Sequence, residues 1–235
     1  LCILLLLKEH SGSAWFALVT YFGFVRNSLS FFKITNQRKI MARPVEFNEH
    51  KVLTSAMEQF WRDGFEASSI QKLLDSTGIN RGTLYNSFGD KETFFKSCVD
   101  HYNKLVGAQI QVSLKNSQLK DWDAISKFFE VCFVEVSNKN RGMGCLLVNT
   151  FCESINYDKE MKKIARSSIA AIRKPLLERL TGAKKAKKLT KGITAEFAAD
   201  VLMNSLHGLR VNSRDGKSAK QLIELAKFSI SSLRR

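Results

Sequence analysis

The 235-residue sequence has two prolines, 13 glycines and five cysteines, none of them in a CxxC pair. Scarce proline argues against a loop-dense all-β chain and favours long helices. The cysteine spacing argues against a disulfide-stapled secreted fold and predicts a reducing cytoplasm. No uncharged apolar stretch reaches the ~18 residues that a membrane-spanning helix needs. The remaining composition, 44% hydrophobic and 25% charged, is typical of a globular protein.

Residues 1–40 differ in character from the rest of the sequence. The apolar run at residues 4–7 has no basic residue before it, whereas a signal peptide has a basic start. The first methionine is Met41, and a capped amphipathic pattern begins just after it. We therefore expect residues 1–40 to be upstream sequence or disordered, with the native start at Met41. The alternative is a genuine membrane-associated extension.

The net charge of +15 permits a polyanionic partner such as nucleic acid, but the charge is unevenly placed. Residues 41–102 carry seven basic and nine acidic side chains, whereas residues 103–235 carry 25 basic and 12 acidic ones. Lysines cluster at residues 159–166 and 184–191, which we interpret as a solvated helix face and a solvated loop. The basic excess therefore lies outside the segment that we expect to read DNA.

Residues 48–88 predict three helices with clear boundaries. Apolar residues recur at helical spacing over residues 52–61, after a candidate N-cap at Asn48 and before a stop at Gly64. A Ser68–Gln71 pair predicts a capping box for the second helix. Residues 77–80 then form the short link of a helix-turn-helix, in which Gly78 permits a left-handed turn.

The third of these helices, from Asn80 to Asn86, is short and polar, which favours a partner such as the DNA major groove. Hydroxyls, basic groups and helix N-termini would contact phosphates. The candidate DNA-binding residues are Arg43, Ser69, Asn80, Arg81, Thr83, Tyr85, Asn86 and Lys91. The alternative is three helices that only pack together, with Arg81 and Asn86 as solvated surface.

Roughly fifty residues resemble the TetR family of bacterial transcriptional regulators in order and without gaps, and the matching text is at residues 43–47, 56–70 and 77–92. The resemblance implies a homodimer of all-helical subunits, in which a ligand releases the protein from DNA. It implies a helix-turn-helix DNA-binding domain at residues 41–100 and a helical ligand-binding and dimerisation domain at residues 101–235. It also implies a recognition helix that carries Thr83, Tyr85 and Asn86, and a phosphate contact at Lys91.

The body offers two interpretations of its apolar residues. An aromatic-rich stripe over residues 122–136 is either core or pocket lining, and the tentative pocket residues are Trp122, Phe129, Phe133, Cys145, Cys152 and His207. Residues 141–150 resemble one subgroup of the family and open a body helix, which would place Cys145 and Cys152 on one face. These thiols are inert buried groups, or a redox or electrophile sensor, or less plausibly a metal site.

The last third predicts two long helices, from Thr194 to Leu209 and from Ser218 to Leu233, joined by a turn at residues 214–217. As in the family, two such helices per subunit would form a symmetric dimer interface. His207 and Arg210 lie near that interface and could face the pocket.

No phosphate loop, nucleophile elbow, paired catalytic carboxylates or metal-ligand spacing is evident, so we expect no enzyme, cofactor or metal. The sequence thus predicts a cytoplasmic, ligand-responsive dimeric repressor of a palindromic operator. A thiol-based sensor and a membrane-tethered regulator are the alternatives.

Overall fold

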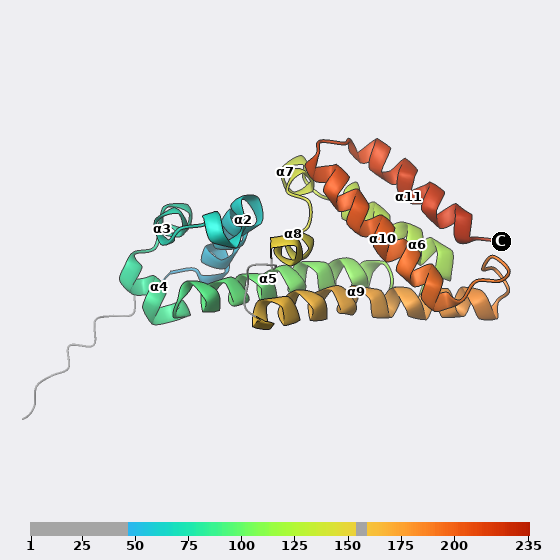
Figure 1. Ribbon diagram of the computed structural model, residues 1–235, viewed down its shortest axis with the longest axis horizontal. Coiled ribbons are helices and arrows are strands. Elements are labelled where there is room, and N and C mark those ends of the chain that lie inside the picture. The colour runs from blue at the N-terminus through green and yellow to red at the C-terminus, as the bar shows by residue number, and fades with distance from the viewer. Residues whose placement is uncertain (1–46, 154–158) are drawn as a thin grey trace, which may run out of the picture. The chain divides into compact units, whose positions relative to one another are not determined.

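The computed structural model describes residues 47–153 and 159–235, so Arg43 and the segment at residues 1–40 lie outside the described residues. Helices make up the described part, with one isolated bridge between Leu189 and Arg234 (Figure 1). The helices are α2 (Glu49–Ala67), α3 (Ile70–Thr77), α4 (Arg81–Phe88), α5 (Lys91–Val112), α6 (Asp121–Phe133), α7 (Asn138–Gly142), α8 (Leu146–Glu153), α9 (Lys159–Lys185), α10 (Ala195–Arg214) and α11 (Ala219–Leu233). The predicted all-α fold is confirmed, and none of these helices is long and apolar enough to cross a bilayer.

Helix α2 begins and breaks where the sequence predicts. The Asn48 side chain accepts a hydrogen bond from the Lys51 N–H at 3.0 Å, which satisfies one free donor of the first turn. Gly64, at φ 82° and ψ 173°, interrupts the helical backbone within α2. Its apolar face, including Phe60 at 1% exposure, packs against α3 and against Phe94 and Phe95 of α5. We call α2, α3 and α4 the head.

The predicted capping box at Ser68 is wrong. Ser68 is buried, and its hydroxyl donates to the Gly64 carbonyl oxygen at 2.6 Å, so this side chain belongs to the break in α2. Ser69 is the N-cap of α3 and accepts from the Lys72 N–H at 3.2 Å. With two serines in a row, the sequence does not tell which of them caps α3. The Gly64 carbonyl oxygen, freed by the break in α2, takes the hydroxyl of Ser68 and leaves Ser69 as the cap.

Helices α3 and α4 are joined by residues 78–80, one residue fewer than the predicted link at residues 77–80, because Thr77 is the last residue of α3. Gly78 adopts a left-handed conformation, φ 72° and ψ 8°, and its N–H bonds to the Leu74 carbonyl oxygen at 2.8 Å. Asn80 then caps α4 by accepting from the Thr83 N–H at 2.8 Å. The end of α3 and the start of α4 are therefore each fixed by a cap, and the buried side chains of Leu73 and Leu84 hold the two helices to the core.

Helix α5 runs without interruption through residue 100, where the sequence predicts the domain boundary. The head and the helices beyond it thus share one continuous helix.

The loop after α5 is held by Arg179 of α9, whose guanidinium donates to the carbonyl oxygens of Leu114, Asn116 and Leu119 at 2.6–2.9 Å.

The remaining helices form a second packed layer, which we call the body: α6 to α11 with the C-terminal half of α5. Figure 1 shows α10 crossing α9, with α11 beside α10. Thr194 caps α10, and Ser218 with Gln221 forms a capping box at the start of α11. The two predicted C-terminal helices are confirmed, whereas the predicted stripe of α6 is too long, because that helix ends at Phe133.

Candidate nucleic-acid interface and candidate ligand pocket

Helix α4 is held by a few buried side chains and otherwise faces outward. Leu84 and Phe88 are its buried anchors, at 0% and 7% exposure. Arg81, Tyr85 and Asn86 are exposed, Tyr85 at 46% although it is a large aromatic residue. A short helix that buries so little of itself and carries donors on its outer side matches the requirements of a major-groove reader.

Three of the other predicted DNA-contact residues already serve the fold. Thr83 is 9% exposed, so it offers little surface to a partner. The side chains of Ser69 and Asn80 are exposed but accept the N-cap bonds of α3 and α4. The free N–H groups of these two helix starts are the natural donors to phosphate on this side of the head.

Lys91 opens α5 and folds back on the head. Its Nζ lies 4.4 Å from the centre of the Phe65 ring and donates to the Glu66 carbonyl oxygen at 3.4 Å. Burial lowers the pKa of this lysine, opposed in part by the nearby Glu66 carboxylate. The ammonium is nonetheless at the edge of the head, next to the exposed N-terminus of α5.

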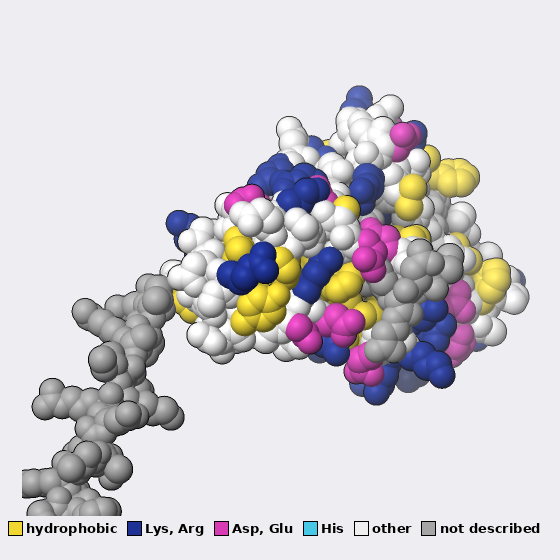
Figure 2. Space-filling model, turned by 60° about the vertical axis from the view of Figure 1, so that its left-hand side comes forward, with side chains coloured by type: hydrophobic (Ala, Val, Ile, Leu, Met, Phe, Trp, Pro, Cys, Tyr) yellow, Lys and Arg dark blue, Asp and Glu magenta, His cyan; other side chains and the backbone are white. Residues whose placement is uncertain are grey.

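Two basic residues of the head are engaged by an acidic one. Asp63 accepts from Lys72 Nζ at 2.9 Å and from Arg62 Nε at 3.2 Å, and the hydrogen bond from Lys72 is the main reason that the pKa of Asp63 is lowered. Figure 2, in which the head comes forward, shows Lys and Arg interspersed with Asp and Glu rather than one unbroken basic face. Shape and specific donors, more than net charge, distinguish this surface.

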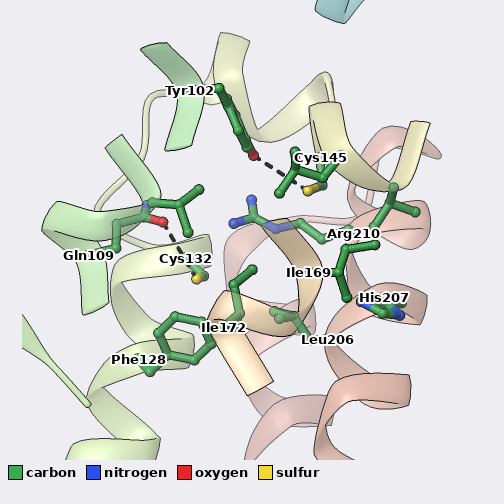
Figure 3. A pocket seen from close by; sticks show the side chains of 13 residues that line it. Tyr102, Gln109, Phe128, Cys132, Cys145, Ile169, Ile172, Leu206, His207 and Arg210 are labelled. Atoms are coloured by element: carbon green, nitrogen blue, oxygen red, sulfur yellow. Dashed lines mark hydrogen bonds between the residues drawn. The ribbon is translucent and has the colours of Figure 1, made fainter. Parts of the chain in front are cut away.

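The body contains an internal cavity bounded by α5, α6, α8, α9 and α10 (Figure 3). Its polar lining is Tyr102, Gln109, Cys132, Cys145, His207 and Arg210, and its apolar lining is Val106, Phe128, Leu147, Val148, Ile169, Ile172 and Leu206. The Tyr102 hydroxyl donates to Cys145 Sγ at 3.5 Å, and Cys132 Sγ donates to Gln109 Oε1 at 3.9 Å. The enclosed space is about 20 Å³, and a second hollow of about 310 Å³ shares the wall formed by Val148, Ile169 and His207.

The predicted pocket residues fall into three groups. Cys145 and His207 line the cavity, as does Arg210, which the sequence placed near it. Phe133 reaches the cavity only through Arg210, whose guanidinium carbon lies 4.9 Å from the centre of the Phe133 ring. Trp122 and Phe129 are core residues outside the lining, and Cys152 is exposed.

The prediction that Cys145 and Cys152 share a helix face is wrong. Cys145 precedes the first residue of α8 and is 7% exposed, whereas Cys152 lies in the last turn and is exposed. Cys145 stands one residue before α8, outside the helix proper, so helical spacing does not fix the direction of its side chain relative to that of Cys152. Cys132 is the thiol that joins Cys145 in the cavity.

Helix α8 connects the cavity to the head. Its residues Leu147 and Val148 line the cavity, while Asn149 Nδ2 donates to the Trp61 carbonyl oxygen at 3.5 Å. One turn further on, the Glu153 carboxylate accepts from the Phe65 N–H at 3.1 Å, beside the break in α2. A shift of this two-turn helix would therefore change both the lining of the cavity and the hydrogen bonds to α2.

Two residues that sequence reasoning passed over are also part of this region. Tyr102 lies between the head and the cavity, and the indole N–H of Trp61 is buried with no acceptor among the described residues. Both belong to runs of apolar residues at helical spacing, and that spacing does not distinguish a residue that lines a cavity from one that is packed in the core. Arg210, by contrast, is the residue that the sequence did place near the pocket, and it is a charged side chain within the otherwise buried run of Leu206, Leu209 and Ser213.

Within residues 47–153 and 159–235, no cluster of three or more histidine, cysteine or acidic residues is arranged to hold a metal ion. The rings of His50 and His101 meet edge to face with their centroids 4.8 Å apart, and His101 Nε2 is 3.0 Å from the Thr54 hydroxyl. This pair therefore serves the packing of α2 against α5.

Comparison with known proteins agrees with this geometry. Residues 52–98 match the family model described as bacterial regulatory proteins, tetR family. The HTH-type transcriptional repressor ComR of Escherichia coli is 25% identical over 190 residues, which cover 80% of this chain and 90% of ComR.

Solved structures show the same fold. A cysteine-substituted variant of the TetR family transcriptional regulator CifR, complexed with 26-base-pair operator DNA, superposes with a TM-score of 0.71 at 21% identity. The alignment covers 81% of this chain and 99% of CifR. The reduced form of Escherichia coli NemR gives a TM-score of 0.67 at 20% identity, covering 80% of this chain and 96% of NemR.

Proposed function

Because this chain belongs to the TetR family of bacterial regulatory proteins, a family of DNA-binding regulators rather than enzymes, we propose that it is a dimeric transcriptional repressor released from a palindromic operator by a small molecule. The observation that carries the proposal is α4, a short helix anchored by Leu84 and Phe88 and presenting Arg81, Tyr85 and Asn86 outward. The operator-bound structure of CifR, which has the same fold, supports it.

In this proposal Tyr85 and Asn86 contact base edges, and Arg81 contacts bases or the backbone. The N-termini of α4 and α5, with Lys91, contact phosphates. The engagement of Lys72 and Arg62 by Asp63 predicts weak non-specific binding, because that binding scales with the number of phosphates neutralised.

The dimer is supported by an exposed apolar face on α10 and α11. Phe197 and Val211 of α10 are 57% and 58% exposed, and Leu225 and Phe228 of α11 are 45% and 74% exposed. Gly208 lies between them on α10 with no atom within 4 Å of the position of a Cβ, so a partner helix can approach closely there. A second copy of the chain covers this face in our proposal.

The effector site is the body cavity together with the 310 Å³ hollow beside it. The lining is mostly apolar with a few convergent polar groups, as small-molecule sites are. Helix α8 transmits occupancy to α2 through Asn149 and Glu153. Ligand binding then alters the position of the head and lowers operator affinity.

Selection of genomic fragments by the purified chain, followed by sequencing, tests the proposal. We expect a few strongly enriched inverted repeats with half-sites about one helical turn or a multiple of it apart. Enrichment that is diffuse, or independent of Tyr85 and Asn86, would contradict it.

Thiol-based sensing is a second candidate, favoured by one observation: Cys132 and Cys145 both face the cavity beside Arg210 (Figure 3). Burial raises the pKa of Cys132, with Arg210 opposing the rise, so its reactivity depends on access rather than on a stable thiolate. If Cys132→Ser with Cys145→Ser retains effector response but loses release by a thiol-reactive electrophile, the cysteines are the sensor. Release that persists in this double variant would rule it out.

A further inference from the structure

Arg210 is a buried charge with few partners. The residue is 7% exposed, and its guanidinium is always ionised near neutral pH. Its face lies over the Phe133 ring at 4.9 Å, and Nη1 is 3.5 Å from the Gly144 carbonyl oxygen, at the limit of a hydrogen bond. No ion pair of the described residues includes Arg210.

Arg179, in the same body, is an arginine whose guanidinium has a full set of hydrogen-bond acceptors. Its three guanidinium nitrogens each donate to a carbonyl oxygen at 2.6–2.9 Å, and the Asp121 carboxylate lies 3.7 Å away. Arg210 has neither the ring of carbonyls nor the carboxylate. An unpaired buried charge is strongly disfavoured, so its retention calls for an anion that comes from outside.

The polar neighbours of Arg210 do not supply that anion. Burial raises the pKa of Tyr102 well above its usual range, and burial raises that of Cys132 despite the guanidinium. Both groups are therefore neutral near pH 7. Gln109, the remaining polar neighbour from α5, is an uncharged amide that accepts from Cys132 and donates to the Val131 carbonyl oxygen.

A second cavity, of about 70 Å³, lies on the side of Arg210 that faces the head. Trp61, Tyr102, Leu105, Val106, Gln109, Val136, Asn140 and Arg210 line it. Trp61 is 5% exposed, and its indole N–H has no acceptor among the described residues. The indole N–H has no acceptor and the guanidinium has no charged one, and both groups are donors only, so two donors from different helices that lack an anionic partner line one small space.

We propose that this cavity, which we call the junction cavity, binds the carboxylate of a small organic acid between Arg210 and Trp61. A carboxylate matches the planar fork of a guanidinium and can accept a further N–H. The apolar lining by Leu105, Val106 and Val136 suits a short hydrocarbon tail. Since a water molecule occupies about 30 Å³ of liquid, a cavity of this size admits an acid of only a few carbons.

The position of the junction cavity gives the ligand a regulatory role, and this step rests on the proposed function. Trp61 belongs to α2 of the head and Arg210 to α10 of the body. A carboxylate held by both ties the head to the body in one arrangement. Operator affinity then changes on binding, and the operator changes carboxylate affinity by the same factor.

Sodium propionate is the probe, with the uncharged isostere propionamide and sodium chloride at equal ionic strength as controls. For the full chain we expect a saturable rise of the thermal unfolding midpoint with propionate, and none with propionamide or chloride. Equal effects of propionate and propionamide would overturn the proposal. Equal effects of propionate and chloride would overturn the choice of a carboxylate.

Two variants assign the effect to the cavity. Arg210→Met should abolish the propionate response while leaving the midpoint in propionate-free buffer unchanged or higher, because a buried charge has been removed. The matched control Arg179→Met should lower the midpoint and retain the response. Trp61→Phe, which keeps an aromatic ring, should weaken propionate binding about tenfold by removing one donor to a charged group. A propionate response that survives both Arg210→Met and Trp61→Phe would refute the site.

Operator binding separates this inference from the proposed function. With an operator fragment obtained by genomic selection, propionate should change the affinity of the parent and not of Arg210→Met. Propionate binding without any specific DNA binding would refute the proposed function and leave the site standing. Specific DNA binding without a propionate response would refute the carboxylate site and leave the proposed function standing.

Discussion

Gly64 lies where α2 breaks and where the body touches the head, so it is the position at which one methyl group should be most damaging. Its backbone, at φ 82° and ψ 173°, belongs to a region that only glycine occupies readily. A Cβ there would lie 2.6 Å from Glu153 Oε2 and 2.7 Å from the carboxylate carbon. Gly64→Ala must therefore both strain the backbone and displace Glu153 from the Phe65 N–H.

The magnitude follows from these two effects. Backbone strain of this kind costs about 1–3 kcal/mol. Loss of the hydrogen bond to a charged carboxylate costs about 1.5–3 kcal/mol more. Gly64→Ala should thus lower the free energy of unfolding by roughly 2.5–6 kcal/mol, a large part of the ~5–15 kcal/mol of a typical domain. Urea denaturation followed by far-ultraviolet circular dichroism measures it.

Gly107→Ala is the matched control, because Gly107 is inside α5 with nothing within 4 Å of its Cβ position. That change should raise stability by about 0.5–1 kcal/mol, as alanine favours a helix. In a Glu153→Ala background the hydrogen bond is already absent, so Gly64→Ala should there cost only the backbone strain of about 1–3 kcal/mol. A Gly64→Ala protein within 1 kcal/mol of the parent would refute the description of this junction.

Four further changes test other parts of the molecule. Asn80→Ala removes the cap of α4 and should cost about 1 kcal/mol in urea denaturation. Asn86→Ala, at an exposed position, should leave stability unchanged but weaken operator binding by about 1–3 kcal/mol in fluorescence anisotropy, with unchanged affinity contradicting its role. Phe228→Asp should shift the mass by light scattering toward the monomer, whereas Val112→Asp, also exposed, should not. Burial, with His50 and Lys104 nearby, lowers the pKa of His101. The free energy of unfolding should therefore be constant above about pH 6.5 and fall as the pH drops below it, by at most ~1.4 kcal/mol per pH unit from this residue. His101→Gln should make this dependence shallower.

Local signals in the sequence predict much of the fold because each depends on neighbouring residues alone. Asn48, Asn80 and Thr194 cap helices where the pattern places them, and Gly78 turns the chain as a left-handed glycine should. The same reasoning fails at Ser68, where the deciding interaction is with a carbonyl oxygen of the preceding helix break. A cap is a local property only when nothing else competes for the side chain.

The cavities could not be predicted, because they depend on which faces of distant helices meet. Helical spacing alone cannot separate Cys132, which lines the cavity, from Phe129, which is core one turn earlier. The junction cavity joins Trp61, Tyr102 and Arg210, which come from three helices far apart in sequence. Only their packing brings the unpartnered indole N–H of Trp61 and the guanidinium of Arg210 to one place.

The central claim, that α4 reads a specific operator, is tested most directly by parallel genomic selections with the parent chain and with Tyr85→Ala/Asn86→Ala. Circular dichroism of both proteins checks that the exposed double substitution leaves the fold intact. We predict sharply enriched inverted repeats for the parent and none for the variant. The same enriched sequences in both selections, or in neither, would contradict the assignment of α4 as the recognition helix.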